Sequence, residues 1–403
     1  MLRRFFKDRR GNVAQIFGLS IFPLVGIVGA AIDYSRATQV RTGMQAALDA
    51  TALTLSFDAV GMDDPTLQST AQNMFKANFH QPNAVPDSGT ATAVLTQPQE
   101  GNFKLVVTGT ATINTTVAKV LTQQPLPVSS SATVKWGMKK LELALALDNT
   151  GSMAQSGKLA ALKTASHNLL TVLKNASKKP GDIKVAIIPF TTVVNIGTGY
   201  KDQFWIDYSV NGIQKANWTG CVIDRTQNND VLDTPPANGT SSTYYPAATN
   251  SSCGALTTAM PLSEDWTALN NKVDAMAASG NTNVTIGLAW GWHALTSTDP
   301  FTQAAPVASD LDKVIVMLTD GTNTQNRWTN SSSAIDARTQ KVCDNIKAAN
   351  IKLYTIRVID GNSQLLSGCA TKPSMYYEVT QASQLNNVFT SIAQNLANLR
   401  IAE

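Results

Sequence analysis

Two apolar runs, each followed at once by a polar loop, dominate the C-terminal two thirds of this sequence. Residues 141–147 (LELALAL) are apolar at all but one position, and residues 313–318 (KVIVML) are apolar after the first. Runs of this length between turn residues are typical of strands covered on both faces of a parallel sheet. Helical patterns separate these and further strands, so we predict a doubly wound, Rossmann-like α/β domain over residues 141–399. The predicted strands are residues 141–147, 183–189, 313–318, 351–358 and 376–379, and the predicted helices are residues 158–173, 266–276, 333–349 and 384–397, with one more directly after residue 282.

The first sixty residues have the pattern of a membrane helix that continues as an amphipathic helix. Residues 13–32 contain no charged residue, and a helix of that length spans about 30 Å, the thickness of a hydrocarbon core. Residues 33–58 then place apolar side chains on one face at helical spacing, so we predict a pilin-like stem that continues the membrane helix. That face comprises Val40, Met44, Ala47, Leu48 and Leu55, with Thr51 as its one polar member.

Positive charge precedes the apolar run, and little follows it. This asymmetry predicts a single-pass protein with a cytoplasmic N-terminus and the remaining chain outside. A signal peptide cleaved near residues 29–31 is the alternative, although twenty apolar residues are long for a signal peptide and the helical pattern continues beyond them. The charged residues of this basic tip are Arg3, Arg4, Lys7, Arg9 and Arg10, with Asp8.

Three regions follow from these patterns: residues 1–59 as basic tip, membrane helix and stem, residues 60–140 as a small α+β module with a linker, and residues 141–399 as the α/β domain. The α/β domain contains a polar segment of roughly sixty residues, 197–258, that has no clear period. Such a length exceeds ordinary connections, so we predict an ordered insertion or a functional loop. Within the module we predict a helix at 66–79, strands at 90–95, 103–113 and 128–135, and a link at 136–140.

Polar side chains gather where the two apolar runs end. Asp148, Thr150 and Ser152 occupy alternate positions after the first run, Asp320 follows the second, and the loop before a predicted helix offers Thr282. Carboxyl ends of strands in an open α/β sheet are where ligands bind. Two carboxylates and three hydroxyls form an oxygen-only donor set that suits Mg²⁺, with Mn²⁺ or Ca²⁺ as alternatives. These five residues are the candidate metal site.

The five residues resemble the metal-ion-dependent adhesion site (MIDAS) of von Willebrand factor type A (vWA) domains. That pattern is Asp-x-Ser-x-Ser, then Thr, then Asp, and Thr150 replaces its first serine while keeping the hydroxyl. The resemblance implies that the three hydroxyls bind the cation directly or nearly so, while Asp148 and Asp320 hold coordinated waters. A position left open on the cation would bind an Asp or Glu carboxylate of a partner protein. A vWA fold that keeps the loops without metal is the alternative.

Two further stretches resemble proteins of the Tad (Flp) pilus assembly system. Residues 9–37 (RRGNVAQIFGLSIFPLVGIVGAAIDYSRA) are similar to the N-terminal segment of TadE/TadG-like proteins, and residues 287–301 (GLAWGWHALTSTDPF) are similar to the vWA part of TadG-like proteins. The resemblance implies a bacterial inner-membrane component of pilus assembly or adhesion that works with other pilus-assembly proteins. Its bulk would be periplasmic or on the cell surface. The alternative is a structural scaffold of the assembly machinery whose metal only stabilises the vWA loops.

Composition and the lack of known catalytic motifs argue against several other functions. Charged residues are 15% of the chain and apolar ones 43%, which is typical of a globular protein. The net charge is only +4, and the sequence has no cluster of basic residues interleaved with aromatic ones, so we expect no nucleic-acid partner. HExxH, GxSxG and P-loop motifs are missing, and the histidines at 80, 167 and 293 are scattered, so we expect no enzyme.

Four cysteines permit three disulfide pairings. Proximity in the sequence favours Cys221 with Cys253, which would staple the insertion. It also favours Cys343 with Cys369, which would tie a helix to the loop after the next strand. An even number of cysteines in an exported domain indicates disulfides, whereas four free thiols would fit a cytosolic domain.

Overall fold

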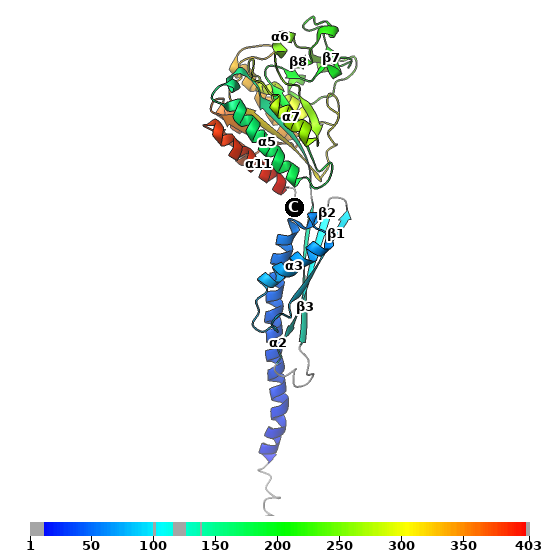
Figure 1. Ribbon diagram of the computed structural model, residues 1–403, viewed down its shortest axis with the longest axis vertical. Helices are drawn as coiled ribbons and strands as arrows, with labels where there is room; N and C mark the ends of the chain where they lie inside the picture. Colours follow the sequence, from blue (N-terminus) through cyan, green and yellow to red (C-terminus); the bar gives the residue numbers. More distant parts are fainter. Residues whose placement is uncertain (1–11, 100–101, 116–125, 138, 400–403) are drawn as a thin grey trace, which may run out of the picture. The chain divides into compact units, whose positions relative to one another are not determined.

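The computed structural model describes residues 12–99, 102–115, 126–137 and 139–399 (Figure 1). It divides the chain into two compact units, residues 1–137 and 138–403. The predicted basic tip falls almost wholly on residues 1–11, outside the described residues, and stays a prediction.

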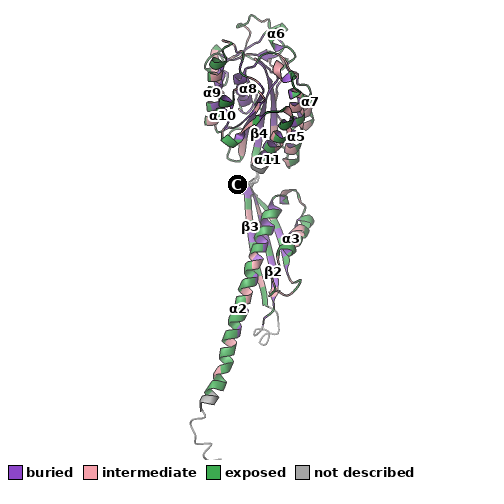
Figure 2. Ribbon diagram, turned by 90° about the vertical axis from the view of Figure 1, so that its left-hand side faces the viewer, coloured by how far each residue is buried: buried purple, intermediate pink, exposed green. Residues whose placement is uncertain are grey.

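One helix, α2 (Asn12–Ser56), contains both the apolar run and the stem. In the part of the chain that the structure describes, it is the one helix long and apolar enough to cross a membrane. Its N-terminal half exposes large apolar side chains, including Phe17 and Phe22, and is mostly green in Figure 2. The predicted face of the stem is buried, which confirms that prediction. Thr51 satisfies its buried hydroxyl by donating to the carbonyl of Ala47 at 2.7 Å.

The rest of the first unit is a three-stranded antiparallel sheet in the order β1-β2-β3, with α2 and α3 packed against it. Alternate residues of β2, such as Leu105 and Val107, are buried. The predicted link at residues 136–140 is wrong at both ends, because Trp136 stacks on Phe103 within the sheet and Lys140 begins the next strand. The elements are α3 (Asp64–Asn78), β1 (Thr90–Gln99), β2 (Asn102–Ile113) and β3 (Leu126–Gly137).

The second unit is built on one sheet in the order β13-β12-β11-β4-β5-β6-β8, with β10 also paired to β5. The first five strands are mutually parallel, while β6 and β10 run antiparallel to β5. This confirms the predicted doubly wound α/β class and adds an antiparallel edge. The strands are β4 (Lys140–Asp148), β5 (Ile183–Phe190), β6 (Val194–Asn195), β8 (Cys221–Val222), β10 (Met260–Ser263), β11 (Leu311–Thr319), β12 (Lys352–Val358) and β13 (Tyr376–Val379).

Helices cover both faces of this sheet (Figures 1 and 2). The leucines of β4 point to the core shared with α5, α7 and α11, and its alanines to the core shared with α8 and α9. Small residues let α8 approach closely, since a Cβ on Gly291 would lie 3.7 Å from that of Ala146. The helices are α5 (Lys158–Ala176), α7 (Trp266–Asp274), α8 (Val284–His293), α9 (Ser332–Ala348), α10 (Ser363–Cys369) and α11 (Leu385–Leu399).

Residues 197–258 form short elements around buried aromatic side chains. Strands β7 (Ile206–Asp207) and β9 (Tyr245–Pro246) pair in parallel, and α6 (Asn250–Cys253) follows. Trp205, Trp218 and Tyr245 are buried in the same core as α8. Burial of these side chains attaches the segment to the body of the domain.

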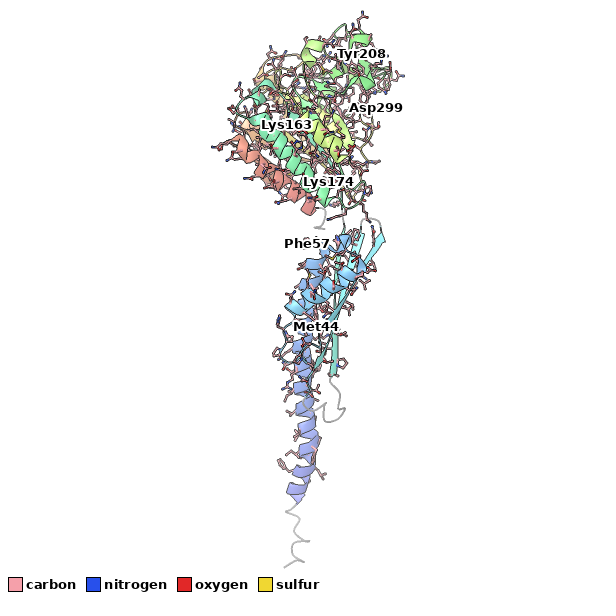
Figure 3. All side chains as sticks on the ribbon, in the orientation of Figure 1. Met44, Phe57, Lys163, Lys174, Tyr208 and Asp299 are labelled. Carbon is pink, nitrogen blue, oxygen red and sulfur yellow. A yellow bond between two sulfur atoms is a disulfide. The ribbon has the colours of Figure 1, made fainter. Side chains whose placement is uncertain are left out.

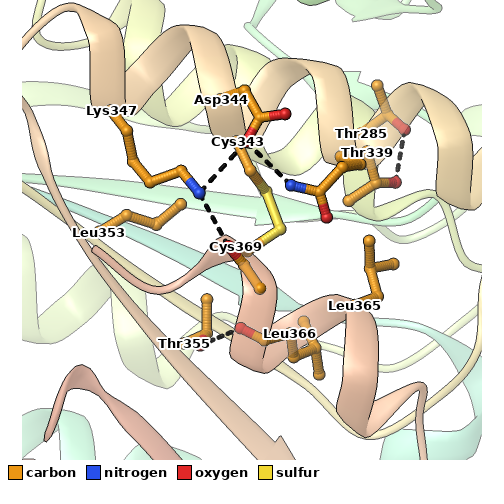
Figure 4. The surroundings of a disulfide bond; sticks show 12 residues. Thr285, Thr339, Cys343, Asp344, Lys347, Leu353, Thr355, Leu365, Leu366 and Cys369 are labelled. Atoms are coloured by element: carbon orange, nitrogen blue, oxygen red, sulfur yellow. Dashed lines mark hydrogen bonds and ion pairs between the residues drawn. A yellow bond between two sulfur atoms is a disulfide. The ribbon is translucent and has the colours of Figure 1, made fainter. Parts of the chain in front are cut away.

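Both favoured disulfides are present, which confirms the pairing. Cys221 of β8 bonds to Cys253 of α6. Cys343 of α9 bonds to Cys369, and Figure 4 shows this bond with the ion pair of Lys347 and Asp344 beside it. The expectation that Cys369 lies in a loop is wrong, because it ends helix α10, whose short apolar run was not recognised as helical.

Candidate metal centre

All five predicted site residues lie beside the carboxyl ends of two central strands, β4 and β11, in the second unit. Strands β4 and β11 are parallel neighbours, with Leu147 paired to Leu318, so the loops that follow them begin side by side. The loop after β4 forms a short 3-10 helix, Gly151–Ala154, and donates a hydrogen bond from the Gly151 amide to the Gly280 carbonyl at 3.0 Å. That contact brings in the loop that contains Thr282.

Hydroxyl and carboxylate oxygens from these loops lie within hydrogen-bonding distance of one another. Ser152 Oγ donates to Oδ1 of Asp320 at 2.6 Å and lies 3.0 Å from Oγ1 of Thr150. A Cβ built on Gly321 would lie 3.7 Å from Oγ1 of Thr282 and 3.8 Å from Oγ of Ser152. The missing side chain of Gly321 therefore leaves room in front of two of the predicted donors.

Asp148 is fully buried, and protein groups contact both of its oxygens. Oδ1 accepts the Thr150 amide at 2.8 Å, and Oδ2 accepts the Thr319 hydroxyl at 2.6 Å. Burial, followed by repulsion from the charge of Asp320, raises the pKa of Asp148 to about 6. A nearby positive charge would favour the ionised form, so this carboxyl is suited to a cation site.

Lys158 was not among the predicted residues, yet its ammonium group reaches this site. It is the first residue of α5, and helical side chains lean toward the N-terminus, so its chain runs back over the loop after β4. Nζ lies 2.5 Å from Oδ2 of Asp320, and both side chains are buried. Among the described residues Oδ2 has no well-aligned hydrogen-bond donor, so Lys158 acts there chiefly as a positive charge.

The insertion is connected to the site through Asp224, which the sequence reading also missed. Asn283, next to Thr282, donates its side-chain amide to both oxygens of Asp224 at 2.9 and 3.0 Å. The Arg327 amide, from the loop after β11, donates to Oδ2 at 3.2 Å. Burial raises the pKa of Asp224 to about 6. One buried carboxylate thus joins the insertion to two loops of the site.

Comparison with known families identifies two parts of the chain. Residues 11–54 match the TadE/G-like family of Flp pilus assembly, and residues 245–391 match the von Willebrand factor type A domain. The chain carries a TadE/G-like segment and a vWA domain. Both are the families predicted from the sequence. The vWA match contains Thr282 and Asp320 and begins after Asp148, whose strand β4 belongs to the same sheet.

Solved structures similar to this chain include pilus proteins and a protein of the mussel byssus. The pilus adhesin SpaC from Lactobacillus rhamnosus GG is 14% identical with a TM-score of 0.42, and the match covers 79% of this chain and 35% of SpaC. The vWF domain of the type V pili tip protein Mfa5 from Porphyromonas gingivalis is 10% identical with a TM-score of 0.41, covering 66% of this chain and 97% of that domain. Proximal thread matrix protein 1 from the mussel byssus, with a zinc-occupied MIDAS motif, is 10% identical with a TM-score of 0.38, covering 64% and 48%. No curated protein matches the sequence.

The side chains of the vWA site fit a hard divalent cation. Within the described ranges no three His, Cys, Asp or Glu side chains cluster, so hydroxyl groups must supply part of any coordination shell here. Hydroxyl and carboxylate oxygens are the donors that Mg²⁺, Mn²⁺ and Ca²⁺ accept. Ser152 is only half-buried, whereas Asp148, Thr150, Thr282 and Asp320 are buried. The site is therefore open to solvent on the side of Ser152.

Proposed function

We propose that this chain is a membrane-anchored component of pilus assembly or adhesion whose vWA domain binds a partner carboxylate through a divalent cation. The observation that carries the proposal is the convergence of Ser152, Asp320 and Thr282 from three separate loops. The TadE/G-like segment supports the pilus context, and the apolar half of α2 supports the membrane anchor.

The surroundings of each residue indicate its role in binding the cation. Thr282 and Ser152 present hydroxyl oxygens toward the space at Gly321, and Oγ1 of Thr150 lies 3.0 Å from Oγ of Ser152. These three hydroxyl groups would hold the cation. Asp148 already accepts two hydrogen bonds and would contribute charge and hold coordinated waters. When bound, the cation supplies a coordination position for an Asp or Glu of a partner, with Mg²⁺ the ion we favour.

Topology and compartment follow from the same proposal. The N-terminus would be cytoplasmic and the vWA domain periplasmic or on the cell surface, in a bacterial inner-membrane protein. The two disulfides support an oxidising compartment for the second unit. Other pilus-assembly proteins would be the partners.

The test is cation-dependent association in native membranes. Chemical crosslinking of the full-length chain to other pilus-assembly proteins is compared with Mg²⁺ and with EDTA, in the wild type and in Ser152→Ala. We expect Mg²⁺-dependent crosslinks that are lost in Ser152→Ala, with Ser367→Ala, an exposed serine of α10, as the control. A crosslinking yield that changes neither with Mg²⁺ nor with the Ser152 substitution would contradict partner binding through the cation.

A structural scaffold is the second candidate, and the ion pair of Lys158 with Asp320 favours it. A protein cation already offsets the charge of Asp320, so the loops can keep their arrangement without metal. For a scaffold, Asp148→Ala would lower the melting temperature and leave pilus assembly intact.

We further propose that the chain is not an enzyme. His167 of α5 contacts Asn270 and Asp274, and His293 of α8 packs against Tyr245 and Trp290, so neither imidazole serves the cation site as a base. Metal-assisted hydrolysis commonly uses a general base beside the cation, and these two imidazoles do not supply one.

A further inference from the structure

Lys158 brings a positive charge to the place where a divalent cation would bind. Its side chain is only 5% exposed, and Nζ lies 2.5 Å from Oδ2 of Asp320. Ser152 occupies the other oxygen of the same carboxylate at 2.6 Å. Both oxygens of Asp320 are thus occupied by groups of the chain itself.

Burial makes this contact matter for cation binding. Two like charges a few ångströms apart repel strongly where water is excluded, and Asp320 is only 1% exposed. An ammonium group on Asp320 and a divalent cation bound beside Asp320 would therefore oppose each other. Withdrawing the ammonium group from its buried partner also costs free energy, because a buried ion pair that is broken leaves an uncompensated charge.

We propose that Lys158 is a built-in competitor of the divalent cation. Its ammonium group holds Asp320 in the cation-free protein, and it withdraws from Asp320 when the cation binds. The proposal rests on the cation site of the proposed function and adds a residue that sets its affinity. It also explains how the loops keep two carboxylates, Asp148 and Asp320, together in a buried site without metal.

Competition has two effects of opposite sign. Removing the ammonium group should destabilise the cation-free protein, since Asp320 loses its counter-charge. The same change should strengthen cation binding, since nothing has to leave. A lysine with a purely structural role would weaken both, so the two signs together distinguish competition from support.

The experiment is calorimetric titration of Mn²⁺ into the full-length chain in detergent. Lys158→Met removes the charge and keeps most of the side-chain volume. Lys174→Met removes a charge from an exposed position of the same helix (Figure 3) and is the matched control. We expect Lys158→Met to bind Mn²⁺ about tenfold more tightly than the wild type, with a lower melting temperature in EDTA, and Lys174→Met to match the wild type.

The possible results separate this inference from the proposed function. Equal or weaker Mn²⁺ binding by Lys158→Met, with saturable binding by the wild type, overturns the competition and leaves the cation site in place. Saturable binding by Lys158→Met alone supports competition in its strongest form. A lack of saturable binding by either protein overturns both the cation site and the competition.

A second measurement uses only the wild type and covers the case in which Lys158→Met does not fold. The full-length chain is acylated with an amine-reactive ester, with and without saturating Mn²⁺, and modification is measured by mass spectrometry of peptides. We expect Lys158 to be protected without Mn²⁺ and modified with it, while exposed Lys174 is modified equally in both. Protection of Lys158 in both conditions would overturn its withdrawal.

Discussion

The hydroxyl group of Ser152 donates a 2.6 Å hydrogen bond to Oδ1 of Asp320, a residue 168 positions later in the chain. Ser152 belongs to the loop after β4, and Asp320 directly follows β11. The bond therefore joins the carboxyl ends of two parallel strands. Substitutions in the loops at these strand ends can change cation binding while the hydrophobic core of the sheet stays intact.

The hydroxyl group of Thr282 gives the first prediction. Thr282→Val keeps the shape of the side chain and removes one of the three donor hydroxyls, so we expect Mn²⁺ affinity to fall by about tenfold or more. Calorimetry of the full-length chain measures it. Thr164→Val, an exposed threonine of α5, is the control. Unchanged affinity in Thr282→Val would exclude this loop from the site.

The pH dependence of stability gives the second prediction. Asp148 and Asp224 each have a pKa raised from 3.8 to about 6. The folded state therefore holds extra protons between about pH 4 and 6, and the free energy of unfolding falls as pH rises through that window. Each group contributes about 3 kcal/mol at most. Bound Mg²⁺ favours ionised Asp148 and should reduce the fall.

Urea unfolding followed by tryptophan fluorescence measures this dependence in EDTA and in Mg²⁺. Six of the seven tryptophans lie in the second unit, so the signal reports chiefly on the vWA domain. Asp148→Asn should flatten the pH dependence of the EDTA series. If Asp148→Asn and the wild type change equally between pH 4 and 6, the raised pKa of Asp148 is wrong.

The disulfide between α9 and α10 gives the third prediction. Cys343 and Cys369 are 26 positions apart and buried. Opening a loop of this size by the double substitution Cys343→Ala/Cys369→Ala should lower the free energy of unfolding by about 3 kcal/mol. Urea unfolding without a reducing agent, so that the bond between Cys221 and Cys253 stays closed in both proteins, measures it. An unchanged midpoint would show that the bond adds no stability.

Asp224 gives the fourth prediction. Asp224→Ala leaves the buried side-chain amide of Asn283 without its acceptor, which should cost about 1–3 kcal/mol of stability. Because Asn283 adjoins Thr282, we also expect weaker Mn²⁺ binding, measured by calorimetry. Asp202→Ala, an exposed carboxylate of the same insertion, is the control. Full Mn²⁺ affinity in Asp224→Ala would show that the insertion does not support the site.

Much of the fold and the predicted donor set could be read from local sequence patterns. Strand β4 and the alternate polar residues after it are contiguous, so the motif at Asp148 stands out in one short stretch. Helix α10 was missed because seven residues show too little helical period.

Lys158 and Asp224 escaped prediction for a different reason. Their roles depend on partners 162 and 59 positions away, Asp320 and Asn283, and no local pattern marks such pairs. The direction in which side chains lean along a helix was the one available signal for Lys158. Nothing in the polar insertion distinguishes Asp224 from its neighbouring acidic residues before folding.

The proposed function depends on the binding of a divalent cation at the carboxyl ends of β4 and β11. Calorimetric titration of Mg²⁺ into the full-length chain, wild type beside Asp148→Asn, tests it most directly. We expect one saturable site in the wild type and binding at least about tenfold weaker in Asp148→Asn. A folded wild type without saturable binding of Mg²⁺, or equal binding by the two proteins, would contradict it.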